Sequence, residues 1–303
     1  MLEKEIIRAK ARELGFTSCG FAEVLPLQEE AGELEEWLHL GMHAEMAYME
    51  KYKDLRRDPR LLLEGAKTAV VVAMNYFPGN PFGKTSKYKV SRYAQGSDYH
   101  ELLREKLAWL LAFARELDSG IEGRYFVDSG PVMEKAWARR AGLGWTGKNG
   151  LLLTRKSGSW VFLGILFLNR AFEPDSPMKE YCGNCTRCID SCPTGAIVSP
   201  GKVNAGKCIS YLTIEKKGAF ESGVPAWDGW IFGCDSCQQV CPWNHKTSLT
   251  SIREFLPREE ILNLHDGDWE NMDMARFKSL FKNSAVKRAK LEGLKRNILW
   301  VKK

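Results

Sequence analysis

Residues 182–193 read CGNCTRCIDSCP, and residues 234–242 read CDSCQQVCP. Two, two and three residues separate the four thiols of the first stretch, and the second stretch repeats the last two of these gaps. Each stretch ends in Cys-Pro, and Cys208 lies between them, with 25 residues separating it from Cys234. Eight of the nine cysteines therefore fall between residues 182 and 241. Cys19 stands apart in an apolar stretch, where we expect a buried core thiol.

This spacing is that of two-cluster bacterial ferredoxins, in which the fourth cysteine of each run ligates the other cluster. We therefore predict two [4Fe–4S] clusters. The first has the ligands Cys182, Cys185, Cys188 and Cys241, and the second has Cys192, Cys208, Cys234 and Cys237. Zinc and disulfide bonds are the alternatives. Zinc sites favour separate Cys-x2-Cys pairs, and disulfide bonds need an oxidising compartment.

Length and charge set broad limits on the protein. A chain of 303 residues is long enough for one large domain and a small one. The net charge of +6 permits an anionic partner. The N-terminal residues MLEKE lack the apolar core of a signal peptide, and the longest apolar run, residues 160–168, is too short to span a bilayer. We expect a soluble, cytoplasmic protein without a membrane partner.

Helical and strand patterns alternate up to about residue 170. Residues 69–76 (AVVVAMNY) and 160–168 predict buried strands, residues 101–117 predict an amphipathic helix, and residues 34–49 predict another helix. We predict an α/β or α+β domain over residues 1–170 and a ferredoxin-like domain over residues 171–249. A short, helical, basic tail follows over residues 250–303.

The last part of this tail is strongly basic. Residues 282–303 hold eight Lys or Arg and one acidic residue, Glu292. One interpretation is a solvated amphipathic helix that packs on the body of the protein. The other is a surface that contacts nucleic acid phosphates.

Asp128 ends a predicted short strand, residues 124–128, and begins a turn. Polar residues at strand ends often face ligands, so Asp128 is a candidate catalytic residue. An Asx turn or a helix cap would explain it equally. Residues 142–147 (GLGWTG) match a dinucleotide fingerprint, but a helix precedes them and a strand follows, which reverses the order that this motif requires. We expect instead a glycine-rich loop that can lie against a flat cofactor.

Several segments together resemble one family, the epoxyqueuosine reductases. They are SDYH at residues 97–100, VDSGPV at 127–132, AGLGWTGKN at 141–149, the first cysteine run, CISYLT at 208–213 and GCDSCQQVCP at 233–242. The resemblance covers nearly the whole chain, in order. The cysteine run alone is common to many proteins, and its combination with the Asp128 segment and Cys208 is specific.

The resemblance implies an activity, the reduction of epoxyqueuosine in the tRNA wobble position to queuosine. The epoxide oxygen leaves as water, which requires two electrons and two protons. The resemblance also implies cobalamin as a cofactor, reduced through the two clusters. It makes Asp128 the proton donor, with Tyr99 as a second catalytic candidate. We expect Asp128 to have a raised pKa beside an apolar corrin, so that it holds a proton at neutral pH.

By the same resemblance, the corrin lies between the N-terminal and cluster domains. The residues expected to touch it are Arg56, Ser91, Asp128, Lys148, Asn149, Ser210, Asp235 and Ser236. Asp98 and His100 begin the Asp-x-His-x-x-Gly motif of a cobalt ligand, but Leu103 replaces its glycine. We therefore expect a cobalt without a histidine ligand, and a helix capped by Asp98 or its neighbours.

Many family members continue into helical repeats that help to hold tRNA, whereas this chain stops at Lys303. We expect a short form, in which residues 282–303 carry more of the tRNA binding. A low-potential flavodoxin or ferredoxin is the expected electron donor. The alternatives are a cobalamin and iron–sulfur reductase of a small molecule, similar to reductive dehalogenases, and a ferredoxin-type electron carrier without catalysis.

Overall fold

A four-stranded antiparallel sheet forms the centre of the N-terminal part of the chain. The computed structural model describes residues 4–79, 85–220, 224 and 227–302. The strand order is β1 (Ser18–Glu23), β2 (Thr68–Asn75), β7 (Val161–Leu168) and β4 (Gly123–Phe126), and each neighbouring pair is antiparallel. Helices and strands are thus not joined through a parallel sheet, which favours α+β over α/β.

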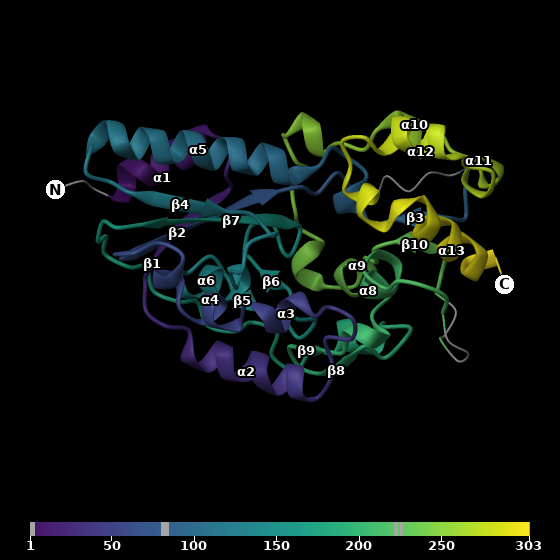
Figure 1. Ribbon diagram of the computed structural model, residues 1–303, viewed down its shortest axis with the longest axis horizontal. Helices are drawn as coiled ribbons and strands as arrows, with labels where there is room; N and C mark the ends of the chain where they lie inside the picture. Colours follow the sequence, from purple (N-terminus) through teal and green to yellow (C-terminus); the bar gives the residue numbers. More distant parts are fainter. Residues whose placement is uncertain (1–3, 80–84, 221–223, 225–226, 303) are drawn as a thin grey trace.

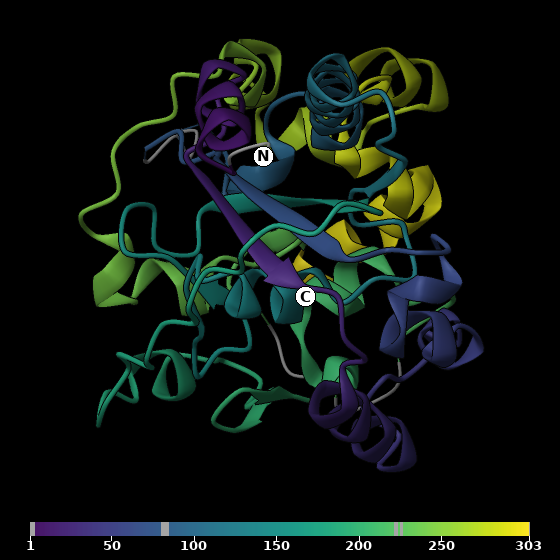
Figure 2. The ribbon, with the colours of Figure 1, turned by 90° about the vertical axis from the view of Figure 1, so that its left-hand side faces the viewer.

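Strand β2 explains how the sheet is covered. All eight of its residues are buried, and its side chains alternate between two cores. Val70, Val72 and Met74 join the core under α1 (Lys4–Glu13) and α5 (Tyr99–Leu117). Val71 and its same-face neighbours join the core against α6 (Glu134–Arg140). Figures 1 and 2 show α1 and α5 on one face of the sheet, with α6 on the other.

The remaining elements connect the strands of this sheet or follow the last of them in the chain. They are α2 (Gln28–His39), α3 (Tyr48–Lys51), α4 (Lys53–Arg57), η1 (Pro59–Leu61), β3 (Lys89–Val90), η2 (Arg92–Ala94), β5 (Trp145–Thr146), β6 (Leu152–Leu153), α7 (Arg187–Asp190), β8 (Ile197–Ser199), β9 (Lys202–Val203), η3 (Ala205–Lys207), α8 (Ile209–Ile214), β10 (Trp230–Phe232), α9 (Ser236–Gln239), η4 (Pro242–Asn244), η5 (Arg253–Phe255), α10 (Glu259–Leu262), α11 (Asp266–Glu270), α12 (Met274–Phe281), η6 (Ala285–Ala289) and α13 (Lys290–Lys302).

Contacts join the three predicted segments of the chain. Strand β3 pairs in parallel with β10, although 140 positions separate Val90 from Trp230. Helix α13 buries Leu291, Leu294 and Ile298 in the core that also holds Ile231 and Phe232. The C-terminal helices lie beside β3 and β10 in Figure 1. The boundaries at residues 170 and 249 stay a prediction.

The predicted helix over residues 34–49 is wrong in its bounds. Helix α2 begins at Gln28 and ends at His39, and α3 begins only at Tyr48. Gly41 and Ala44, between them, have positive φ angles of 65° and 52°, which a helix cannot accommodate. The other main elements lie within about two residues of the predictions, as far as the described residues allow. No helix in the described ranges has the length and apolar character needed to cross a bilayer.

Candidate active site

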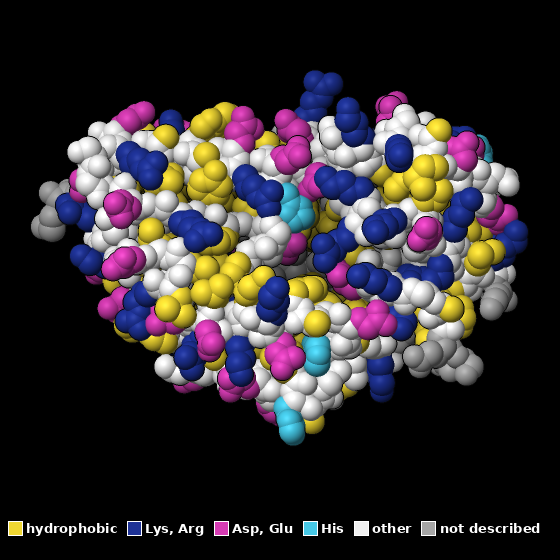
Figure 3. Space-filling model, viewed as in Figure 1, with side chains coloured by type: hydrophobic (Ala, Val, Ile, Leu, Met, Phe, Trp, Pro, Cys, Tyr) yellow, Lys and Arg dark blue, Asp and Glu magenta, His cyan; other side chains and the backbone are white. Residues whose placement is uncertain are grey.

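A large cavity opens where the sheet, α5, α6 and the C-terminal segment meet. Its volume is about 2050 Å³. Figure 3 shows a hollow near the centre of this face, with Lys and Arg side chains gathered around it. The cationic residues in the wall are Arg56, Arg104, Arg124, Lys135, Arg139, Lys148, Lys202, Lys287, Arg288 and Lys290. Nine Asp or Glu side chains among the described residues line the same wall, so the pocket suits a large ligand with several polar and charged groups.

Asp128 lies in the wall of this cavity. Strand β4 ends at Phe126, and the chain turns sharply, with a hydrogen bond of 2.6 Å from Ser129 N to Val127 O. Asp128 itself has a φ of 52°, an uncommon conformation for a residue other than glycine. Its side chain is 65% exposed. The turn thus presents the carboxylate to the cavity rather than to the core.

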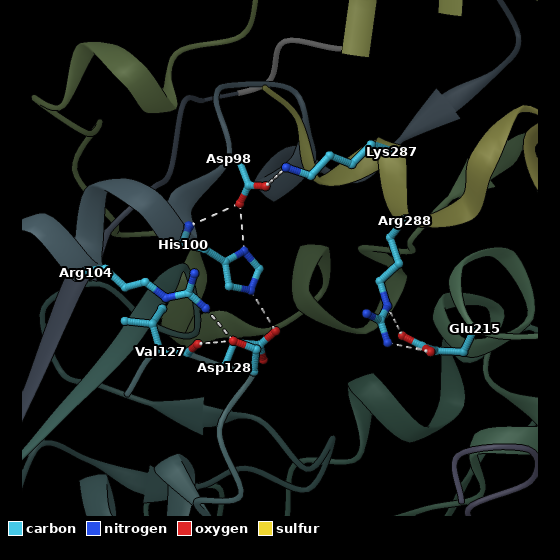
Figure 4. Close-up of polar contacts among 9 residues, drawn as sticks. Asp98, His100, Arg104, Val127, Asp128, Glu215, Lys287 and Arg288 are labelled. Atoms are coloured by element: carbon cyan, nitrogen blue, oxygen red, sulfur yellow. Dashed lines mark hydrogen bonds and ion pairs between the residues drawn. The ribbon is translucent and has the colours of Figure 1, made fainter. Parts of the chain in front are cut away.

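His100 connects Asp128 to two further charged residues. Its Nε2 lies 3.1 Å from Asp128 Oδ2, and its Nδ1 lies 2.7 Å from Asp98 Oδ1. Asp98 Oδ2 in turn lies 2.9 Å from Lys287 Nζ. Figure 4 shows this row of four side chains from Lys287 to Asp128. Asp98 also caps α5, because its Oδ1 accepts a hydrogen bond from the His100 backbone N–H, which confirms the predicted cap.

The charges in this row determine where a proton resides. Burial alone would lower the pKa of His100, but hydrogen bonds to Asp128 and Asp98 and their charges raise it to about 9. Burial alone would raise the pKa of Asp128, but the hydrogen bond and charge of His100 lower it below its ordinary value. The hydrogen bond and charge of His100 therefore oppose the raised pKa that was expected for Asp128 beside a corrin. At neutral pH His100 carries the proton and Asp128 is an anion.

Tyr99 packs directly against this pair. Its ring stacks on His100, with the centroids 4.1 Å apart, and on Phe162, with the centroids 4.0 Å apart. Burial raises the pKa of Tyr99, and the charge of Asp128 raises it further. Tyr99 therefore keeps its hydroxyl proton at neutral pH, and the stacking holds the His100 ring in place.

Two buried polar atoms in the cavity wall have no hydrogen-bond partner among the described residues. They are Nε of Arg56, a residue that is 8% exposed, and Oε1 of Glu134. Burial raises the pKa of Glu134 to about 8, so that its carboxyl group is protonated at neutral pH. Buried polar groups in proteins normally have partners. Arg56 and Glu134 therefore offer one donor and one carboxyl group to a bound ligand.

The first predicted ligand set is grouped in space. Burial raises the pKa of Cys188, and the nearby thiols Cys241 and Cys182 raise it further. Burial also raises the pKa of Cys241, whose ionisable neighbours include Cys182 and Cys185. These four cysteines are the ones that the spacing assigns to one cluster.

The second predicted set is grouped in the same way. Burial raises the pKa of Cys234 to about 12, with Cys208 among its neighbours. Cys208 in turn has Cys192 as a neighbour. Burial raises the pKa of Cys237 too, and Cys234 and Cys208 raise it further. The sulfur neighbours of Cys188, Cys208, Cys234 and Cys241 thus belong to the same predicted set, whereas Cys237 also has Cys188 of the first set as a neighbour. No three His, Cys, Asp or Glu side chains in the described part of the chain form a site for a single metal ion. Cys19 is buried, as expected.

The other predicted corrin contacts fall into two groups. Lys148 lines the cavity and donates a hydrogen bond of 2.5 Å to Gly183 O, beside the first cysteine run. Asn149 is buried next to it, and its Nδ2 has no partner among the described residues. Arg56 and Asp128 line the same cavity.

The second group lies behind the wall, beside the cysteines. Ser91 Oγ donates to Asp235 Oδ1 at 2.5 Å, and Arg92 Nη1 pairs with Asp235 Oδ2 at 3.0 Å. Ser236 Oγ lies 3.3 Å from Cys234 Sγ, and the half-buried Ser210 follows Cys208. The structure thus brings Arg56, Asp128, Lys148 and Asn149 together, whereas Ser91, Ser210, Asp235 and Ser236 do not line the cavity.

Comparison with known proteins identifies the family. The sequence profile described as "Epoxyqueuosine reductase QueG, DUF1730" matches residues 56–129, and "4Fe-4S double cluster binding domain" matches residues 181–244. An epoxyqueuosine reductase from Leadbetterella byssophila is 48% identical over 98% of this chain and 97% of its own length. One from Cellulophaga algicola is 46% identical over 98% and 97%.

The chain belongs to the epoxyqueuosine reductase family. A solved epoxyqueuosine reductase with an epoxyqueuosine-modified tRNA-Tyr stem loop is 30% identical, with a TM-score of 0.88 over 98% of this chain and 80% of that one. A Bacillus subtilis structure, described as having its catalytic aspartate loop swung out of the active site, is 31% identical, with a TM-score of 0.87 over the same shares. This epoxyqueuosine reductase is an oxidoreductase of queuosine biosynthesis with a double [4Fe–4S] binding domain.

Three residues of this reductase site were not predicted from the sequence as site residues. His100 was assigned no role, because its motif lacks the glycine of a cobalt ligand. Glu134 lies in α6 with no distinguishing pattern. Lys287 is one of eight Lys or Arg residues between positions 282 and 303. The spacing of Asp98 and His100 at a helix start was the available signal for His100, and only tertiary contacts reveal Glu134 and Lys287.

Proposed function

We propose that this chain reduces the epoxide of epoxyqueuosine at the tRNA wobble position to the alkene of queuosine. The cavity of about 2050 Å³ would hold cobalamin, the two predicted cysteine sets would hold the [4Fe–4S] clusters that supply its electrons, and Asp128 would donate a proton. The hydrogen-bonded pair of Asp128 and His100 in the cavity wall is the observation that carries the proposal. It places a proton store next to a site that is large enough for a macrocycle and a nucleoside.

The residues in the cavity wall fit cobalamin. A corrin carries amide side chains around its rim, which both donate and accept hydrogen bonds. Arg56 Nε and Glu134 Oε1 in the wall, and Nδ2 of the buried Asn149 next to Lys148, are polar atoms without a partner in the described structure, and Lys148 adds a cation. These residues would hold the rim of the corrin. When bound, cobalamin supplies a low-potential cobalt centre that can reduce a strained C–O bond.

The chain supplies protonation and orientation. Opening of the epoxide leaves an alkoxide, which is a poor leaving group until it is protonated. Asp128 is exposed to the cavity and hydrogen-bonded to a protonated His100. A proton passes from His100 Nε2 to the Asp128 carboxylate, and from there to the oxygen of the substrate. Tyr99 stays protonated and holds the His100 ring by stacking, so we assign it as the weaker catalytic candidate.

The sulfur grouping supports the predicted ligand sets for the two clusters. We propose Cys182, Cys185, Cys188 and Cys241 for the first cluster, and Cys192, Cys208, Cys234 and Cys237 for the second. Ser91, Ser210, Asp235 and Ser236 adjoin the second of these sets, through the chain or through hydrogen bonds. A low-potential flavodoxin or ferredoxin donates the electrons to the clusters.

The substrate is a tRNA anticodon stem-loop. A relative has been solved with an epoxyqueuosine-modified tRNA stem loop, and cationic side chains surround the cavity of this chain (Figure 3). Contacts of Lys or Arg with phosphates supply most of the affinity in such complexes. We assign the reaction to the cytoplasm, where tRNA is modified, with residues 1–170 and 171–249 as the cobalamin and cluster domains and residues 250–303 as the basic segment.

The test uses anaerobic, cluster-loaded protein with cobalamin, a strong reductant and tRNA that carries epoxyqueuosine. Digested tRNA is analysed for queuosine by mass. We expect conversion by the wild type and a loss of at least a hundredfold in Asp128→Asn, with cobalamin and iron content unchanged. Conversion by both proteins at the same rate would reject Asp128 as the donor. No conversion by fully loaded wild type would reject the proposed reaction.

A further inference from the structure

The row of side chains Asp128, His100, Asp98 and Lys287 ends at a residue of the C-terminal segment. Lys287 lies in η6 (Ala285–Ala289), 189 positions after Asp98, and its Nζ lies 2.9 Å from Asp98 Oδ2. The Lys287 side chain is 50% exposed, whereas that of Asp98 is 7% exposed. An almost buried carboxylate thus receives a cation that reaches in from the surface of the cavity (Figure 4).

Asp98 makes polar contacts with both the start of α5 and the C-terminal segment. Its carboxylate accepts from the His100 N–H and ring and from Lys287, and its backbone N–H donates to Asn283 O at 2.8 Å. The start of α5 is therefore attached to the C-terminal segment through both its backbone and its side chain. A buried carboxylate with several donors has a fixed orientation.

The backbone around Lys287 is anchored independently of its side chain. Val286 is fully buried, and the buried Ser284 hydroxyl caps the Val286 N–H at 3.2 Å and donates to Ala94 O at 3.3 Å. The adjacent Arg288 pairs with Glu215 at 2.6 Å. The segment is thus built to present Lys287 at one place. A solvated tail would not need these contacts.

We propose that Lys287 is a positioning residue of the active site: its charge holds the Asp98 carboxylate and limits how strongly Asp98 retains the proton of His100, which faces Asp128. The proposal rests on the proposed function, and it makes residues 284–288 a part of the proton-delivery site rather than a packing element alone. Lys287 touches neither the substrate nor the cofactor in this role. It acts on the reaction through Asp98 and His100.

The sign of the effect of Lys287 can be derived from the charges. The charged or titratable groups around His100 and its two carboxylates are Asp98, Tyr99, Glu101, Arg104, Asp128, Lys287 and Arg288. Lys287 partly neutralises Asp98, so it weakens the hold of Asp98 on the imidazolium proton. Loss of this cation raises the pKa of His100, whereas loss of the Asp98 charge lowers it.

The experiment measures the titration of His100 by nitrogen NMR on cluster-loaded protein, with the signal assigned from His100→Gln. In Lys287→Gln we expect the pKa of His100 to rise by roughly half a pH unit, and in Asp98→Asn to fall. Lys287→Arg restores the wild-type value. Lys282→Gln, which removes the same charge five positions away, leaves it unchanged. A site that is merely loosened shifts the pKa toward 6.5 in both Lys287→Gln and Asp98→Asn, and that result would overturn the proposal.

Turnover of modified tRNA gives an independent readout. A positioning residue predicts that Lys287→Gln lowers kcat about tenfold with KM for tRNA nearly unchanged. A phosphate contact predicts the reverse, a raised KM with kcat retained, and this outcome also contradicts the proposal. The titration needs no turnover, so a failure of the proposed reaction and a failure of the Lys287 proposal give different results.

Discussion

At the scale of single residues, Asp128 combines an unusual backbone with an exposed charge. A φ of 52° is rare for residues other than glycine, and Asp and Asn are among the side chains that adopt it most readily. Such strained residues cluster at functional sites, where the surrounding structure holds them. Asn at this position keeps the backbone and the shape, so that Asp128→Asn tests the charge alone.

The His100 proton predicts a pH dependence of stability. The pKa of His100 is about 9 in the folded protein and about 6.5 in the unfolded chain. The free energy of unfolding gained from this raised pKa is fully present below pH 6.5 and is lost as the pH rises through 9. We expect a loss of up to about 3 kcal/mol across this window, measured by urea unfolding. His100→Gln lacks this slope, and His39→Gln, on the exposed side of α2, keeps it. An unchanged slope in His100→Gln would contradict the assignment.

Glu134 predicts how the cavity binds cobalamin. Because burial raises its pKa to about 8, the carboxyl group is neutral at pH 7, and glutamine is a close substitute. We expect Glu134→Gln to bind cobalamin within about threefold of wild type, and Glu134→Leu about tenfold more weakly, a difference of about 1.4 kcal/mol. An absorbance titration of cluster-loaded protein measures both. Equal affinity in all three proteins would place Glu134 outside the cofactor site.

At the scale of elements, the sequence pattern predicted the helices and strands whose bounds depend on burial of their own side chains. The apolar run of β2 and the leucine spacing of α5 predicted bounds within two residues of those in the structure. A strand that is buried on both faces has a continuous apolar run, and a helix that is buried on one face has apolar residues at helical spacing. The helix predicted over residues 34–49 was wrong, because the turn at Gly41 and Ala44 depends on φ angles that the apolar pattern does not register.

The contact between β1 and α6 predicts an effect on stability. A Cβ on Gly20 would lie 2.0 Å from the Ala141 carbonyl oxygen, at the end of α6. We expect Gly20→Ala to lower the free energy of unfolding by about 2–3 kcal/mol, because α6 must move away from the sheet. Gly32→Ala in α2 is the matched control, since no atom lies within 4 Å of the added Cβ. It should stabilise by about 0.5–1 kcal/mol in the same urea titration. Equal changes in the free energy of unfolding for Gly20→Ala and Gly32→Ala would show that α6 moves away from Gly20 without a cost in stability.

At the scale of the whole molecule, the cavity rim combines cations from distant parts of the chain. Arg288 and Lys290 line it, whereas Lys295 is exposed on α13 and does not. Because Arg288 pairs with Glu215, we expect Lys290→Gln to weaken tRNA binding and to reduce the slope of log K against log salt by about 1. Lys295→Gln should leave both unchanged. Binding at several salt concentrations tests this, and a loss that is the same at all salt concentrations would point to a contact other than phosphate.

The candidate site could be predicted from the sequence only in part. Cysteine spacing predicted a double-cluster domain and the Asp128 segment predicted a candidate acid, because short motifs carry this chemistry. His100 and Lys287 were not predicted, because their roles arise from contacts between α5, the turn after β4 and η6. Residues 282–303 were predicted either as an amphipathic helix packed on the body or as a surface for nucleic acid phosphates. Arg296 donates to the backbone of Leu212, Lys216 and Gly218, and Lys302 pairs with Glu270, as in a packed helix. Lys303 lies outside the described residues.

The row from Lys287 to Asp128 has a consequence for biosynthesis of the protein. All eight cluster cysteines lie before residue 242, whereas Lys287 and the Val286 anchor follow them by more than 40 positions. On a translating ribosome, every predicted cluster ligand therefore emerges before the segment that holds Lys287, the last member of this row. A nascent chain can take up its inorganic cofactors while its protonation machinery is still unfinished.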